Sequence, residues 1–192
     1  MDADWSVELG ADDPVLEFPW VSADGSQSYV DLTQDVGPID TFPEVVTFPL
    51  LHDFLCGLNG PWSPWFTAKC DAWCDDEISE AEEIYGGTMR MCSYVDLIRR
   101  NQQERFSFEQ HERWVKLAAE CLHRFPQSAY CCEFIVRRCY YHLDRSSEES
   151  RAGFYVTAYA FGYGDEETAQ ERWKGCLDRV CYALTRRHDN LR

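Results

Sequence analysis

The first 68 residues of this chain of 192 contain no lysine or arginine, and the first basic residue is Lys69. Residues 1–83 hold 19 aspartates and glutamates against that one lysine, whereas residues 84–192 carry 15 acids and 17 bases. The whole net charge of −16 therefore comes from the first part of the chain. Affinity for nucleic acid depends mostly on cations that neutralise phosphates, so this distribution argues against a nucleic-acid partner. It favours a basic partner, or serves only to keep the protein soluble.

The chain also lacks any apolar run that approaches the ~20 residues needed to span a membrane. Its first residues, MDADWSVELGADD, have neither the basic start nor the apolar middle of a secretory signal. We therefore expect a cytoplasmic protein without a membrane partner. No serine, cysteine or lysine nucleophile motif is present, which disfavours an enzyme without excluding one.

Cysteine is abundant, with ten residues that lie inside apolar patterns. Because no export signal precedes them, we expect reduced core thiols rather than a disulfide scaffold. The one spacing that suits a metal is that of Cys70 and Cys74 in KCDAWC. On a strand, at about 3.3 Å per residue, their sulfurs would lie ~13 Å apart and could not share an ion. The sequence accordingly predicts neither a metal site nor a cofactor.

The hydrophobic content of 45% and the aromatic content of 15% predict a single α+β domain over residues 1–192, with an acidic, flexible segment at 1–13. Alternating and helical patterns follow one another in the order strand, strand, helix, three times over. The first unit is a hairpin around Asp24-Gly25 followed by a short helix. The helices of the second and third units begin at the capping residues Ser107 and Asp165.

One five-residue sequence, SYVDL, occurs at 28–32 and again at 93–97, and a less similar sequence, YVTA, lies at 155–158. Each copy falls on the second strand of its unit, which favours repetition of a structural unit. Residues 28–143 then read β-α-β-β-α-β, the order of a ferredoxin-like fold. The predicted fold is an antiparallel sheet of about six strands with three helices on one face. In it the two SYVDL strands are adjacent and antiparallel.

Period-two alternation assigns the residues of these strands to the two faces of the sheet. Away from the helices it gathers tyrosines and a tryptophan with charges of both signs, the composition of a binding surface. The candidate site on this predicted face consists of Tyr29, Asp31, Thr67, Lys69, Asp71, Trp73, Tyr94, Asp96, Glu133, Arg137, Tyr155, Thr157 and Tyr159. Such residues are also ordinary on a sheet face left to water, where charged cross-strand pairs can be purely structural.

Two functions remain open. The preferred one is a non-enzymatic interaction protein, such as an inhibitor, an immunity-type protein or an adaptor, whose acidic half meets a basic macromolecular partner. The alternative is a small-molecule-binding protein or an enzyme that uses the polar groups of the sheet face, with Asp31 and Asp96 as a carboxylate pair. That pair requires the two aspartates to lie on neighbouring strands and on the same face.

Overall fold

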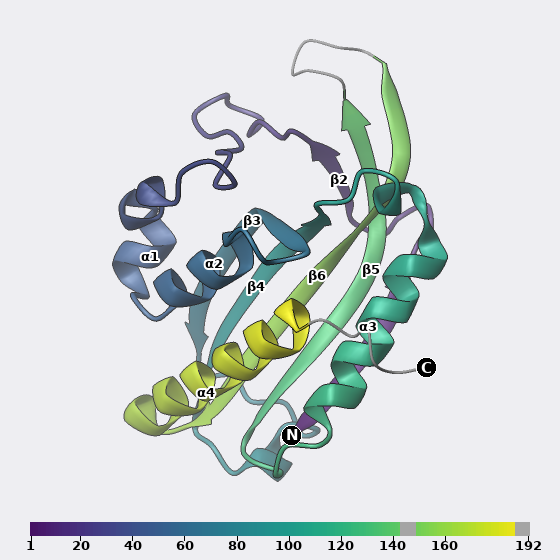
Figure 1. The fold of residues 1–192 in the computed structure, drawn as a ribbon. Coiled ribbons are helices and arrows are strands. Elements are labelled where there is room, and N and C mark those ends of the chain that lie inside the picture. Colours follow the sequence, from purple (N-terminus) through teal and green to yellow (C-terminus); the bar gives the residue numbers. More distant parts are fainter. Residues whose placement is uncertain (143–148, 187–192) are drawn as a thin grey trace.

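The computed structural model describes residues 1–142 and 149–186, which form an α+β fold around one mixed, open sheet of six strands (Figure 1). The strands are β1 (Asp2–Glu8), β2 (Val15–Phe18), β3 (Trp65–Asp75), β4 (Met89–Arg99), β5 (Tyr130–His142) and β6 (Ser150–Gly164). The helices are α1 (Pro43–Thr47), α2 (Leu51–Asn59), α3 (Phe108–Leu122) and α4 (Glu166–Thr185), with the 3-10 turns η1 (Gly37–Thr41), η2 (Glu83–Tyr85) and η3 (Glu104–Phe106).

The strand order across the sheet is β1-β5-β6-β4-β3, and β2 pairs with β5 beyond the end of β1. The pairs β3–β4, β4–β6 and β5–β6 are antiparallel, whereas β1 and β2 run parallel to β5. The prediction of a purely antiparallel sheet is therefore wrong at this edge. The difference arises because residues 2–8 of the segment expected to be flexible form β1, whose Trp5 packs against the core.

Two of the three predicted strand–strand–helix units are confirmed, as β3-β4-α3 and β5-β6-α4. The first unit is not, because residues 28–32 form no strand and contribute only the isolated bridge between Val21 and Ser28. The carboxylate of Asp31 instead accepts hydrogen bonds from the backbone N–H and the hydroxyl of Thr33, at 2.9 and 2.6 Å. Such local side-chain bonds compete with strand pairing.

The strand beside β4 is β6, so the second strands of the two confirmed units pair with each other at the centre of the sheet. The less similar sequence YVTA therefore occupies the place expected for the SYVDL of 28–32. In this pairing Tyr94 lies opposite Tyr159, and Asp96 lies opposite Thr157. The ferredoxin-like order predicted for 28–143 is not confirmed.

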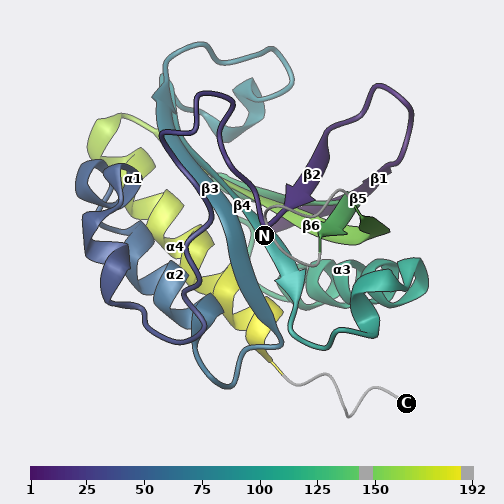
Figure 2. The same ribbon diagram turned by 90° about the horizontal axis from the view of Figure 1, so that it is seen from above.

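The structure has four helices in its described part rather than the predicted three, and α2, α3 and α4 pack on one face of the sheet (Figure 2). The closest approach is at Trp173 of α4, which is fully buried and whose indole N–H donates to Ser93 Oγ of β4 at 3.0 Å. Beneath it, β6 has Gly162, where an added Cβ would lie 2.2 Å from the backbone nitrogen of Trp173. The absence of a side chain at this position allows α4 to lie against the central strands.

The two long helices begin at the residues that the sequence indicated. Ser107 Oγ accepts from the N–H of Gln110 at 3.3 Å, and Asp165 Oδ1 accepts from the N–H of Thr168 at 2.9 Å. Both contacts satisfy amide groups that the first helical turn leaves without a backbone partner.

The close approach of α4 to β6 predicts the effect of Gly162→Ala. The new methyl group would collide with backbone atoms of α4, which can move only by displacing the helix from the sheet. We expect the free energy of unfolding to fall by at least about 2 kcal/mol, measured by urea denaturation.

Gly175→Ala is the matched control for this substitution. Its Cβ would meet only the end of the flexible Arg179 side chain, at 3.3 Å, and alanine favours the helix by about 0.5–1 kcal/mol. If Gly162→Ala were tolerated as well as Gly175→Ala, the close packing of α4 against β6 would be refuted.

Candidate functional site

The face of the sheet away from the helices, called the open face below, carries a row of aromatic side chains across three strands. The ring centroids of Trp73 and Tyr94 lie 6.4 Å apart, those of Tyr94 and Tyr159 lie 5.9 Å apart, and Tyr159 stacks on Phe161 at 6.0 Å. All four side chains are partly exposed. We call these four residues the aromatic row.

Both ends of the open face are covered by other parts of the chain. At one end, residues from β2 and the loop after it form a second, smaller core in which Phe18, Trp20 and Tyr29 pack against buried residues of the sheet. At the other end, the β3–β4 connection folds over the face, where Tyr85 stacks on Tyr163 at 4.5 Å. The aromatic row lies at the centre of the open face, between these two covers.

A chain of polar contacts crosses the centre of the open face beneath the rings. The Thr157 hydroxyl donates to Asp96 Oδ1 at 2.7 Å and accepts from Arg137 Nη1 at 3.0 Å. The guanidinium of Arg137 also donates from Nε and Nη2 to Glu8 Oε2, at 2.8 and 2.7 Å. Asp96, Thr157 and Arg137 are buried, whereas Glu8 at the edge strand is half-buried.

This environment alters the acidity of Asp96. Burial raises the pKa of its carboxyl to about 6, although the Thr157 hydrogen bond and the charges of Arg137 and Lys69 act in the opposite direction. The hydrogen bond from Thr157 to Oδ1 fixes the orientation of this buried carboxyl within the sheet.

The charges that reach the surface of the open face are mostly negative. Lys69 is exposed opposite Asp96 and next to the exposed Asp71 on β3, and towards the other edge the face carries the half-buried Glu133 on β5 and the exposed Asp4 on β1. The Lys69 ammonium lies 6.0 Å from the centre of the Trp20 ring. A cationic ligand on the aromatic row would therefore be surrounded by carboxylates.

Nine of the predicted site residues are brought together here: Lys69, Asp71, Trp73, Tyr94, Asp96, Glu133, Arg137, Thr157 and Tyr159. Thr67 is not among them, because β3 has a bulge between Thr67 and Lys69 that reverses the alternation. Its side chain faces the helices and accepts a hydrogen bond from Asn59 Nδ2 at 2.8 Å.

Three further predictions fail because residues 16–32 fold over one end of the face. Tyr155 is on the predicted side but is buried in the second core. Tyr29 belongs to the covering loop, with its ring 4.6 Å from that of Phe18. Asp31 lies in the same loop and not on a strand next to Asp96, so the predicted carboxylate pair is wrong.

Sequence reasoning missed three of the residues named on this face. Phe161 continues the alternation of Tyr155, Thr157 and Tyr159, so the same pattern, extended by two residues, would have included it. Glu8 and Asp4 could not be found in this way, because their strand, β1, was not predicted.

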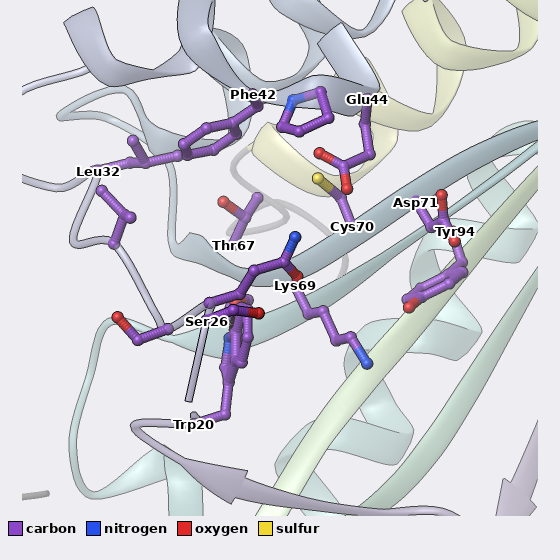
Figure 3. Close-up of a pocket in the computed structure, with 15 residues that line it drawn as sticks. Trp20, Ser26, Leu32, Phe42, Glu44, Thr67, Lys69, Cys70, Asp71 and Tyr94 are labelled. Carbon is purple, nitrogen blue, oxygen red and sulfur yellow. Dashed lines mark hydrogen bonds between the residues drawn. The ribbon is translucent and has the colours of Figure 1, made fainter. Parts of the chain in front are cut away.

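A cavity of ≈ 490 Å³ lies along the outer edge of β3 and reaches the open face at Tyr94 (Figure 3). Its lining includes Lys69 and Asp71 from β3. It also includes Phe42, which joins η1 to α1, and Glu44 of α1. The side chain of Glu44 points towards Cys70, and burial followed by the charge of Glu44 raises the pKa of that thiol to about 12. The Cys70 thiol is therefore protonated and a poor nucleophile.

The ten cysteines, all within the described residues, are unpaired, and most are partly or fully buried. In residues 1–142 and 149–186, no three His, Cys, Asp or Glu side chains are arranged to hold a metal ion. None of the helices in this part of the chain is long and apolar enough to cross a membrane. No protein-family model, curated protein or solved structure matches the chain.

The raised pKa of Asp96 predicts a pH-dependent stability. Because the folded protein binds this proton more tightly than the unfolded chain, the contribution of Asp96 is most favourable below pH 4 and is lost as the pH rises to about 6. Above that, the buried charge costs about 3 kcal/mol. We expect Asp96→Asn to raise the free energy of unfolding at pH 8 relative to the wild type, measured by urea denaturation.

The difference between Asp96→Asn and the wild type should shrink between pH 6 and pH 4, where the wild-type carboxyl becomes neutral. Asp71→Asn, at an exposed position of the same face, serves as the control and should change stability by less than about 0.5 kcal/mol. A destabilised Asp96→Asn protein at pH 8 would show that the charged carboxylate stabilises the fold, contrary to this expectation.

Proposed function

We propose that this protein is a non-enzymatic interaction protein that binds a basic polypeptide partner on its open face. The observation that carries the proposal is the aromatic row, which lies uncovered at the centre of a sheet face whose surface charges are mainly carboxylates. Aromatic anchors at the centre with charged residues at the rim are typical of protein interfaces.

The chemistry of the face suits arginine and lysine side chains. A guanidinium or ammonium group binds over a tyrosine or tryptophan ring with about 0.5–2 kcal/mol. The protein already makes such a contact internally, since the guanidinium carbon of Arg137 lies 5.8 Å from the centre of the Tyr159 ring. A partner's cation above Tyr94 or Tyr159 would have the carboxylates of Asp71 and Glu133 to either side.

Features of the face also argue against catalysis. The most strongly altered carboxyl on it, Asp96, is buried and bonded to Thr157. Burial and the charge of Asp96 raise the pKa of the Tyr94 hydroxyl, so the phenol remains neutral. An inhibitor, an immunity-type protein or an adaptor would each use such a surface for binding alone.

The cavity beside β3 favours a second candidate, a small-molecule-binding protein or an enzyme. Its volume of ≈ 490 Å³ falls within the ~300–1,000 Å³ range of ligand pockets. Its lining combines apolar side chains with a few polar ones, such as Lys69 and Glu44.

The test compares an arginine-rich peptide with a glutamate-rich peptide of equal length, by isothermal titration calorimetry. We expect the arginine-rich peptide to bind and its affinity to fall as salt is raised, because the charges are exposed. The double variant Tyr94→Ala, Tyr159→Ala should bind it at least about tenfold more weakly, since two cation–π contacts are lost.

Tyr182→Ala is the control, because Tyr182 is 48% exposed but lies on α4, on the opposite side of the sheet. It should leave the affinity unchanged. Equal binding of both peptides, or an unaffected double variant, would contradict the proposal.

A further inference from the structure

We propose that the outer edge of β3 accepts an extended segment of the partner as an additional strand. This inference rests on the proposed function, since it assigns the backbone contact through which a basic polypeptide would bind beside the aromatic row. It concerns the edge of the sheet rather than its face. The partner segment would lie in the cavity next to β3, with its side chains alternating between the open face and the helical side.

The first half of this edge is occupied by side chains of the protein itself. β3 is the last strand of the sheet on this side. The backbone N–H of Thr67 donates to Asn59 Oδ1 at 3.1 Å, and the carbonyl of Ala68 accepts from the indole N–H of Trp20 at 2.5 Å. These contacts satisfy the outward-facing groups before and at the bulge.

In the second half of the edge, residues 70–74, no side chain from another element is seen to bond the outward-facing backbone groups that are described. Beyond the bulge, the N–H of Ala72 donates to the side chain of its neighbour Asp71 at 2.8 Å, a local contact that an added strand would replace. Because ladder groups alternate along an antiparallel strand, we infer that the backbone groups of Cys70, Ala72 and Cys74 face outward. An added strand pairs with outward-facing groups of this kind.

The cavity lies at the start of this half of the edge. Five consecutive residues of β3, 67–71, line it, which places it at the strand's edge rather than over one face. Because Thr67 and Ala68 already have partners, an added strand would enter the cavity at residues 69–71 and continue along the edge past 72–74. The opposite wall is formed by residues of the 26–32 segment and by Phe42, Pro43 and Glu44 (Figure 3).

The lining also indicates which side chains the segment would carry. On the helical side of β3, the Glu44 carboxylate lies close to Cys70 and would pair with a basic side chain (Figure 3). Val30, Leu32 and Phe42 offer apolar contacts along the outer wall. Basic residues alternating with β-branched ones, which favour extended backbone, therefore fit the cavity.

The experiment uses two synthetic peptides of equal charge, one alternating arginine with valine and the other alternating arginine with proline. Proline has no backbone N–H and cannot complete the ladder. We expect the arginine–valine peptide to bind at least about tenfold more tightly and to slow amide hydrogen exchange in residues 70–74. A third peptide, which alternates glutamate with valine, is the charge control and should not bind.

Two valine variants test the place of binding. Val30→Trp adds a large side chain at an exposed position that lines the cavity, so it should weaken binding of the arginine–valine peptide at least about tenfold. Val46→Trp is the matched control, because Val46 is 66% exposed on α1 and is not part of the lining. It should leave the affinity unchanged.

The outcomes separate this inference from the proposed function. Equal binding of the two arginine peptides without slower exchange in 70–74, but with sensitivity to Tyr159→Ala, a row residue outside the cavity lining, would overturn strand addition and support the open face alone. Binding that depends on neither charge nor the tyrosines would overturn both. Slower exchange in 70–74 with the arginine–valine peptide, lost in Val30→Trp and kept in Val46→Trp, supports strand addition.

Discussion

The contact of Trp173 with the two central strands determines how the layers of this protein are arranged. The helix backbone at Trp173 lies directly against Gly162 of β6, and the indole N–H reaches Ser93 of β4. One residue of α4 therefore spans the pairing between the second strands of two strand–strand–helix units. With α4 held there, α2 and α3 pack beside it on the same face. The centre of the opposite face is left to side chains of the strands.

The same central pairing explains the polar contacts on the open face. It sets Asp96 opposite Thr157, and a buried carboxyl in that position requires a hydrogen-bond donor, which the threonine hydroxyl supplies. Arg137 on the next strand bonds to the same hydroxyl and needs a carboxylate of its own, provided by Glu8. The parallel strand β1 thus completes a set of contacts that begins in the middle of the sheet.

Much of the fold could be predicted from local patterns, and the failures have physical causes. The caps at Ser107 and Asp165 and the alternation in β4 and β6 depend on neighbouring residues, and these predictions are confirmed. The SYVDL of 28–32 has the same residues as a central strand, but its aspartate bonds locally and its tyrosine packs in the second core. Identical residues therefore gave different structures, because tertiary contacts decided the outcome.

In the candidate site, too, the predictions that rest on local pattern were correct and those that depend on contacts between distant segments were not. Period-two alternation placed Tyr94, Asp96 and Tyr159 on one face correctly, since it holds wherever a strand is regular. It could not reveal the bulge that turns Thr67 towards the helices, because the residues around it alternate without interruption in the sequence. It also could not reveal the loop that covers Tyr155, which depends on contacts between segments far apart in the chain.

The uneven charge of the sequence acquires a spatial meaning in the sheet. The acidic residues 1–83 form β1 and β2 at one edge and β3 at the other, whereas β4, β5 and β6 at the centre come from the nearly neutral remainder. A chain with mixed charge throughout would place cations at both edges and at the centre. Here the carboxylates lie mainly around the rim and most of the aromatic row lies on the central strands. The charge asymmetry therefore places acidic residues at both edges of the sheet, and under the proposed function a basic partner would first make contact there.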